Sequence, residues 1–338
     1  MHNQRLSGKE GKQHTESGFA LLIALSGLLA LLVMSFSTSA RVHIKVAENA
    51  IANAKAEALA DAGLQLGFID VMSRARSGEL GAGTARFCST PDEDALFISI
   101  SDEAGRVDLN LAEKDLIRAL FSGVGLEASQ VLRLTDTILD YRDGDDDRRE
   151  FGAETADYIA AGTTARPRNG SFDTIEEVRG VLGMGRQQFE AVRPFVTVRS
   201  GQTGIDAKVA PDGLVALLSA SRQTKSLAFG GGSQQSDATA LPIGFRAMST
   251  RDVFLVRATS MTRSGAAAAR EAVVRVVPAR PKAQMQLQPD PGFGIRARSR
   301  MPIEGTRRFV LDVSEWRSTS ARTAERQLLS ASLGLPKC

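Results

Sequence analysis

Residues 17–36 read SGFALLIALSGLLALLVMSF, and this stretch decides which kind of protein the chain can be. No charged residue occurs from Ser17 through Ala40. A helix starting at Phe19 and ending at Ala40 would span roughly 33 Å at about 1.5 Å per residue, which is enough to cross a hydrocarbon core of about 30 Å. A short basic flank precedes it. We therefore expect one membrane-spanning helix over residues 19–40, with the N-terminus in the cytoplasm and the bulk of the chain outside.

Three interpretations of this segment stay open. A secretory signal peptide would have a shorter apolar core, of about 7–15 residues, followed by a small-residue cleavage site such as Thr38-Ser-Ala40. A plain signal anchor would need only the apolar helix. A prepilin-type leader ends in Gly before an aromatic residue that opens the helix, and here Gly18 precedes Phe19. In that case cleavage falls between Gly18 and Phe19, and the helix stays in the mature protein.

The apolar pattern continues beyond the predicted membrane segment, and no Pro interrupts residues 19–76. Apolar residues recur every three or four positions, which places them on one face of a helix. We predict one helix of roughly 55 residues whose apolar stripe packs on a sheet of the same chain. This pattern favours the prepilin interpretation. The predicted stripe consists of Ala47, Ile51, Ala54, Ala58, Ala62, Leu66 and Ile69.

The composition excludes several classes of function. The chain has 338 residues, 43% of them hydrophobic, which is enough for one large or two ordinary domains. The net charge of +3 does not demand a polyanionic partner. The histidines are His2, His14 and His43, so the rest of the chain has no imidazole for a Ser-His pair or a zinc site. We predict no catalytic residue. Cys88 and Cys338 could pair or stay as free thiols.

An acidic segment, residues 140–157, has the spacing of a calcium loop. It reads DYRDGDDDRREFGAETAD and holds eight acidic and three basic residues. Asp143, Asp145 and Asp147 stand at positions 1, 3 and 5 of the template, and Glu154 stands at position 12. Position 7 would supply the carbonyl of Arg149, but position 6 holds Arg148 in place of Gly. We predict that Asp143, Asp145, Asp147 and Glu154 bind calcium.

Two other functions for this region remain as alternatives. Two acidic side chains could form a catalytic pair, although nothing in the sequence implies a substrate cleft. Helices joined by Gly123-Val-Gly125 and by Gly183-Met-Gly185 could instead form helix-hairpin-helix modules that hold DNA phosphates with backbone amides. A membrane-anchored DNA-binding protein is therefore the alternative function. The first turn lacks the basic residues that DNA binding would need.

The remaining pattern predicts an α+β fold. A strand at Leu96–Ile100 with Arg106–Leu109 beside it begins a sheet, and a hairpin of 252–260 and 271–278 closes that sheet. We expect loops at 88–91 and 219–242, an extended or disordered segment at 279–305, and a short terminal helix at 322–333. Predicted helices between the two parts of the sheet cover 112–121, 126–142, 174–182 and 185–192.

We therefore expect a pilin-like long N-terminal helix packed on an antiparallel sheet, with a large helical domain inserted in the sheet. The predicted division of the chain is 1–18 leader, 19–40 transmembrane part of the helix, 41–110 outer helix and first strands, 111–218 inserted helical domain with the acidic calcium loop, 219–278 loop and closing strands, and 279–338 C-terminal tail of unknown role.

Several spaced motifs of residues 14–280, in the same order, resemble protein K of the type II secretion system, the largest minor pseudopilin. Most pilins carry Glu at the fifth mature position; here it is Ile23, which fits that family. The matching stretches are Ser17-Gly-Phe-Ala-Leu-Leu22, Ser101-Asp-Glu-Ala-Gly-Arg106 with Asp108-Leu-Asn110, Leu139-Asp-Tyr-Arg-Asp143, Gly152-Ala-Glu154, Pro167-Arg-Asn169, Phe172 with Glu176-Glu177, Val181-Leu-Gly-Met184 and Arg193-Pro-Phe-Val-Thr-Val198.

The resemblance implies a function. A prepilin peptidase would remove the leader after Gly18 and methylate Phe19. The mature protein would join minor pseudopilins I, J and H at the tip of a periplasmic filament. There it would prime assembly of the major pseudopilin, beside the inner-membrane secretion platform, and support protein export across the outer membrane. The family also binds calcium, which we carry over to Asp143, Asp145, Asp147 and Glu154. The tail beyond residue 280 has no evident counterpart.

Overall fold

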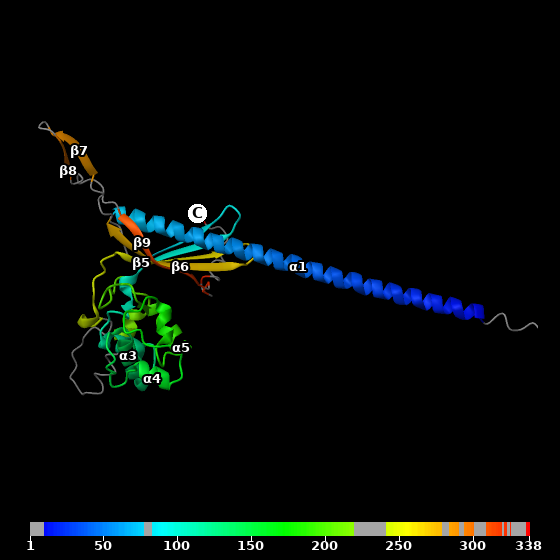
Figure 1. The fold of residues 1–338 in the computed structure, drawn as a ribbon, viewed down its shortest axis with the longest axis horizontal. Helices are drawn as coiled ribbons and strands as arrows, with labels where there is room; N and C mark the ends of the chain where they lie inside the picture. The colour runs from blue at the N-terminus through cyan, green and yellow to red at the C-terminus, as the bar shows by residue number, and fades with distance from the viewer. Residues whose placement is uncertain are drawn as a thin grey trace, which may run out of the picture.

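The computed structural model describes residues 10–77, 83–219, 241–278, 284–290, 294–300, 309–319, 321–322, 325 and 336–338. Helix α1 (Glu10–Ser77) is continuous, and its C-terminal part crosses a β-sheet (Figure 1). A group of shorter helices lies apart from α1, beyond the sheet (Figure 1). The chain is thus an α+β protein with a long N-terminal helix, as predicted.

Five strands form the main sheet in the order β1-β2-β5-β6-β9, and every neighbouring pair is antiparallel. The predicted hairpin is confirmed, since β5 and β6 pair from Val253↔Arg275 to Met261↔Ala267. The strands are β1 (Thr84–Ser89), β2 (Ala95–Asp102), β5 (Val253–Met261), β6 (Ala267–Pro278) and β9 (Phe309–Thr319).

The helical region is an insertion between two neighbouring strands, because β2 ends at Asp102 and β5 begins at Val253. The parallel pair β3 (Val107–Asp108) and β4 (Val196–Thr197) joins the two ends of this insertion. The expected pairing of Arg106–Leu109 with β2 is therefore wrong. The insertion also contains η1 (Glu103–Gly105), α2 (Lys114–Gly123), α3 (Ala128–Arg142), α4 (Thr155–Ala160), η2 (Ile175–Gly180), α5 (Arg186–Val192), η3 (Arg193–Phe195) and η4 (Ile243–Phe245).

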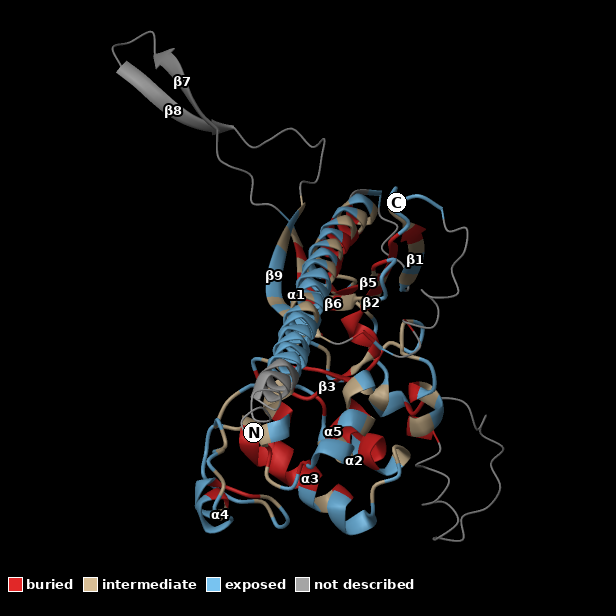
Figure 2. Ribbon diagram, turned by 90° about the vertical axis from the view of Figure 1, so that its right-hand side faces the viewer, coloured by how far each residue is buried: buried red, intermediate tan, exposed pale blue. Residues whose placement is uncertain are grey.

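Two large hydrophobic cores and a smaller one of Cys88, Leu96 and Ile98 lie among the described residues, and Figure 2 shows where the chain is buried. The core of the insertion surrounds Tyr158 and Phe121, and the rings of Tyr141 and Phe172 stack with centroids 4.5 Å apart. The second core lies between α1 and the sheet. Its members include Leu64, Phe68, Val71, Phe254, Val256, Ala272 and Val274.

The face of α1 that packs on the sheet is not the predicted one. Ile51 and Ile69 of the predicted stripe are 70% and 65% exposed. The buried face consists of Ala56, Ala60, Gly63, Leu64, Gly67, Phe68 and Val71. Glycine decides the contact, because a Cβ on Gly63 would lie 2.8 Å from Cβ of Ala258 and one on Gly67 would collide with Val256. The stripe prediction counted apolar side chains and so overlooked both glycines.

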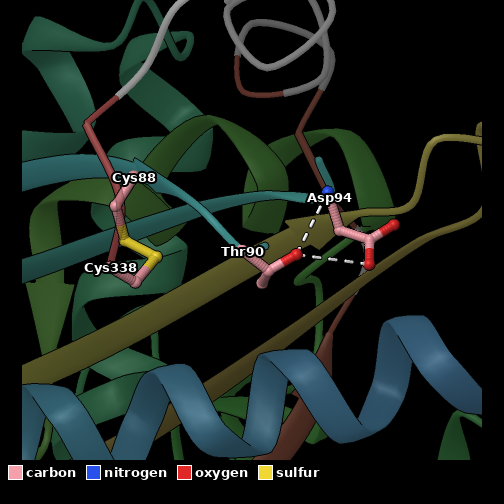
Figure 3. Close-up of a disulfide and its surroundings, with 4 residues drawn as sticks. All are labelled: Cys88, Thr90, Asp94 and Cys338. Carbon is pink, nitrogen blue, oxygen red and sulfur yellow. Dashed lines mark hydrogen bonds between the residues drawn. A yellow bond between two sulfur atoms is a disulfide. The ribbon is translucent and has the colours of Figure 1, made fainter. Parts of the chain in front are cut away.

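The C-terminal end of the chain lies at the β1 edge of the sheet, whereas β9 forms the opposite edge. Cys338 forms a disulfide with Cys88, which lies in β1, so the prediction of a loop at 88–91 is wrong at its first two residues (Figure 3). The backbone of Ser89 also pairs with the tail, donating to Pro336 at 2.8 Å and accepting from Cys338 at 3.0 Å. The tail is therefore held covalently and by the backbone.

Three other predicted segments have different outcomes. The segment 279–305, expected to be extended or disordered, contains the antiparallel hairpin β7 (Gln284–Asp290) and β8 (Gly294–Arg300). The predicted loop at 219–242 and the predicted helix at 322–333 fall almost wholly outside the described residues.

Candidate functional site: the acidic loop and the membrane helix

The acidic loop links the end of α3 to the start of α4. Carboxylate oxygens of Asp143, Asp145 and Glu154 all lie within 4.8 Å of one another. These are three of the four predicted calcium ligands. Asp147 is not part of this group; its backbone N–H donates to Oδ1 of Asp145 at 3.0 Å, which closes a tight turn.

Arg149 holds the loop from inside. Its Nη1 donates to Oδ1 of the buried Asp140 at 2.6 Å and also contacts the carboxylate of Asp143. The predicted contribution of Arg149 was its carbonyl, which here accepts from the N–H of Gly152 at 3.1 Å. Gly152 has to be glycine, because any Cβ there would collide with Asp140. The Arg149 side chain thus neutralises part of the loop and leaves Glu154 without a cation.

Asn169 supports the loop from another part of the insertion. Its Nδ2 donates to the carbonyl of Asp145 at 3.2 Å and to Oδ1 of Asp146 at 2.9 Å. Asn169 adopts a positive φ of 49°, which Asn tolerates better than most residues. In the sequence Asn169 stands out only as part of a motif, since nothing in so distant a tripeptide indicates contact with the loop.

The residues present fit a hard divalent cation. Glu154 is 5% exposed, and neither carboxylate oxygen has a hydrogen-bond partner within the described part of the chain; the same holds for Oδ1 of Asp143. Burial, followed by the charges of Asp140 and Asp143, raises the pKa of Glu154 to about 7. Buried carboxylates without donors are costly unless a cation is bound. Several clustered oxygen ligands are what calcium requires.

The predicted processing residues lie within α1. Gly18 and Phe19 are exposed there, and Phe19 is 67% exposed. Residues Gly18–Ala75 belong to one helix that is long and apolar enough to cross a membrane. Its apolar side chains from Leu21 to Phe36 are exposed, as a lipid-facing segment requires. An N-terminal apolar helix of this kind fits a single-pass membrane anchor.

The glycine turns considered for DNA binding are present. Gly125 and Gly183 have φ values of 86° and 89°. In the first turn, a Cβ on Gly123 would lie 2.9 Å from the carbonyl oxygen of Leu217, whereas one on Gly125 would meet open space.

Part of the chain, including the acidic loop, is similar to a known protein family. Residues 99–201, which include the acidic loop, match the model of the family described as type II secretion system (T2SS), protein K. This match confirms the family resemblance inferred from the spaced motifs. No curated protein matches the chain. Among solved structures, the chain is similar to one in the GspK-GspI-GspJ complex of the type 2 secretion system of enterotoxigenic Escherichia coli, with 16% identity and a TM-score of 0.47, covering 83% of this chain and 99% of that chain.

Proposed function

We propose that this chain, whose residues 99–201 match the type II secretion system protein K family, is a minor pseudopilin at the tip of the periplasmic pseudopilus. There it initiates assembly of the filament and supports protein export across the outer membrane. The observation that carries this proposal is the combination, in one chain, of a membrane-length helix continuous with a sheet-packed helix and an insertion that matches the family.

The N-terminal helix supports a position at the start of the filament. Ile23 would be the fifth residue after cleavage at Gly18, and it is an exposed apolar residue at the depth of the membrane. A carboxylate at that depth is costly unless a neighbouring charge neutralises it. A subunit that enters first has no such neighbour, so an apolar residue suits it. We place the helix in the inner membrane, with the N-terminus cytoplasmic and the folded part periplasmic.

A secretion assay tests this proposal. Deleting the gene should abolish export of a type II substrate without reducing its synthesis, and the wild-type gene should restore export. Gly18→Val should block prepilin peptidase and keep the leader attached, whereas Gly27→Ala, at an open position of the same helix, should be processed normally. Intact mass should show a mature chain that begins at methylated Phe19. Normal export in the deletion strain would refute the proposal.

The partners implied by this role are minor pseudopilins I, J and H, the major pseudopilin, prepilin peptidase and the inner-membrane secretion platform. In a crosslinking experiment in cells, crosslinks between this chain and the other minor pseudopilins should form before crosslinks between this chain and the major pseudopilin. We propose no catalytic activity and no nucleic-acid partner. Salt-dependent binding of duplex DNA by the purified full chain would instead favour the alternative, a membrane-anchored DNA-binding protein.

We also propose that the acidic loop binds calcium through Asp143, Asp145 and Glu154. A bound cation would supply the charge that the unpartnered oxygens of Glu154 lack, and its binding energy would stabilise the insertion. The full chain in detergent should melt at a higher temperature with calcium than with a chelator. Asp143→Asn should remove most of that difference, whereas Asp147→Asn, outside the group of three, should retain it.

A further inference from the structure

A polar cleft lies between the main sheet and the insertion, on the face of the sheet opposite α1. Its volume is about 460 Å³. The floor includes Arg257 and Glu271, whose neighbours Val256 and Ala272 on the same strands are buried in the core under α1. Residues 190–199 of the insertion form one wall, and Arg322 of the tail lies at another side. Three separate parts of the chain therefore contribute to one site.

Glu271 in this cleft, and Glu176 and Glu325 beside it, already have arginine partners. Glu271 contacts Arg257 and accepts from Nε of Arg317 at 2.8 Å. Glu325 accepts from Nε and Nη2 of Arg257 at 2.7 and 2.9 Å. Glu176, beside the cleft, accepts from Nη1 of Arg317 at 2.9 Å. The acceptor oxygens on the floor are thus used within the protein.

Three arginines that line the cleft keep unused hydrogen-bond donors. Arg193 approaches Glu176 and Glu271 only to 3.8 Å, and Arg322 approaches Glu271 only to 3.8 Å. These are ion pairs beyond hydrogen-bond length. Neither guanidinium has a side-chain hydrogen bond within the described ranges. Nε of Arg199 is buried and likewise has no partner there.

The charges around the cleft define the ligand. Arg257 and Arg193 lie near Arg322 and carry the same charge, so a negative group would be favourable there. The cleft is lined by arginines 106, 193, 199, 257, 317 and 322 and by glutamates 103, 190, 271 and 315. With Glu176 and Glu325 beside it, the positive and negative charges are nevertheless equal in number. A singly charged anion suits this balance better than a multiply charged phosphate. Planar guanidinium groups bind carboxylates with two parallel hydrogen bonds.

We propose that the cleft is a binding site for a carboxylate, held by Arg193, Arg199 and Arg322. The volume exceeds that of a lone carboxylate, so an acidic side chain of a partner protein is the ligand that fits. The site joins the sheet, the insertion and the tail, and an occupied cleft would fix their relative positions. The proposed site includes no residue of the acidic loop or of the membrane helix.

The test uses the purified full chain in detergent, at constant ionic strength and a fixed calcium concentration. The probes are N-acetylglutamate, the uncharged N-acetylglutamine and inorganic phosphate. We expect N-acetylglutamate alone to raise the melting temperature in a saturable way. Arg322→Gln should weaken this binding at least tenfold and should fold, because among the described residues Arg322 has no side-chain hydrogen bond to lose. Arg186→Gln, on α5 and outside the cleft, is the matched control.

Each other outcome overturns the proposal. Phosphate binding tighter than N-acetylglutamate would assign the wrong ligand class. Equal effects of N-acetylglutamate and N-acetylglutamine would show that charge is not recognised. Unchanged binding in both Arg322→Gln and Arg193→Gln would place the ligand elsewhere. Because export is not the readout, failure here leaves the proposed secretion role to its own test.

Discussion

At the scale of single residues, we expect Glu154 to make the proposed calcium binding depend on pH. Its pKa is raised to about 7, by burial first and then by the charges of Asp140, Asp143, Asp146 and Asp145. Calcium requires the ionised carboxylate, so one proton must leave as the ion binds. We predict that the apparent calcium affinity falls about tenfold from pH 8 to pH 6. Calorimetric titration in two buffers of different ionisation enthalpy would count the released proton.

The variant Glu154→Gln provides the control for this prediction. It removes the titrating group, so calcium should bind more weakly and with little dependence on pH above 6. A wild-type affinity that stays constant between pH 6 and pH 8 would mean that Glu154 is not a ligand or that its pKa is not raised.

The sequence located the acidic group but not its supports. The template positions of Asp143, Asp145 and Glu154 converge because a short loop keeps nearby residues together. Asp147 stays outside, in a loop that has Arg148 where the template needs Gly and that wraps around the Arg149 side chain. Asn169 is 24 residues from Asp145, and local spacing carries no information on such a contact.

At the scale of elements, Gly67 determines how closely α1 approaches the sheet. A larger side chain there would collide with Val256. We predict that Gly67→Leu destabilises the protein by about 1–3 kcal/mol, the usual cost of overpacking a core. Thermal melting of the full chain in detergent would measure this. Ala58→Leu, on the exposed stripe, should change little. If Ala58→Leu were the harmful change, the packed face would be the predicted one after all.

The wrong choice of helix face has a physical explanation. A long helix with many alanines carries weakly apolar residues on several faces, so periodicity alone does not select one. The buried face is chosen by shape, because Gly63 and Gly67 allow Leu96, Val256 and Ala258 to come close. The strands were easier to predict, since β5 and β6 contain runs of consecutive buried residues rich in valine.

The C-terminal tail should stabilise the sheet through Cys338. The disulfide to Cys88 closes a loop with a sequence separation of 250 residues. Crosslinks over long loops restrict the unfolded chain, and removal of a native disulfide commonly costs about 2–5 kcal/mol. We predict a loss of that order for Cys338→Ser, measured by melting without reductant. Lys337→Ser leaves the disulfide intact and should have no comparable effect. Equal stability of the two variants would show that the tail contributes little.

At the scale of the whole molecule, the sequence predicted that a helical region interrupts the sheet but not what fixes it there. The pattern of helices between two strand regions was sufficient for the first inference. The contact between the insertion and the sheet depends on charged residues far apart in the chain, since Arg317 of β9 is separated by 141 residues from Glu176 of η2. Arg317 contacts Glu271 of the sheet and Glu176 of the insertion together. No periodic pattern indicates such a bridge.

The bridge from Arg317 to Glu176 should couple the insertion energetically to the sheet. The Glu176 side chain is 42% exposed and that of Arg317 21%, so solvent screens part of the attraction. We predict a coupling energy of about 1 kcal/mol in a double-mutant cycle of Glu176→Gln and Arg317→Gln. Chemical denaturation of the full chain in detergent provides the four free energies of unfolding.

The pair Arg168 and Glu177, which lies wholly within the insertion, is the control cycle. Hydrogen exchange would compare the protection of backbone amides in β9 and η2 for the variants of both cycles. If only the Glu176 and Arg317 variants change amide protection in both elements, the ion pair transmits stability between the insertion and the sheet. Additive effects of the two substitutions would mean that the insertion is held by its backbone connections and apolar contacts alone.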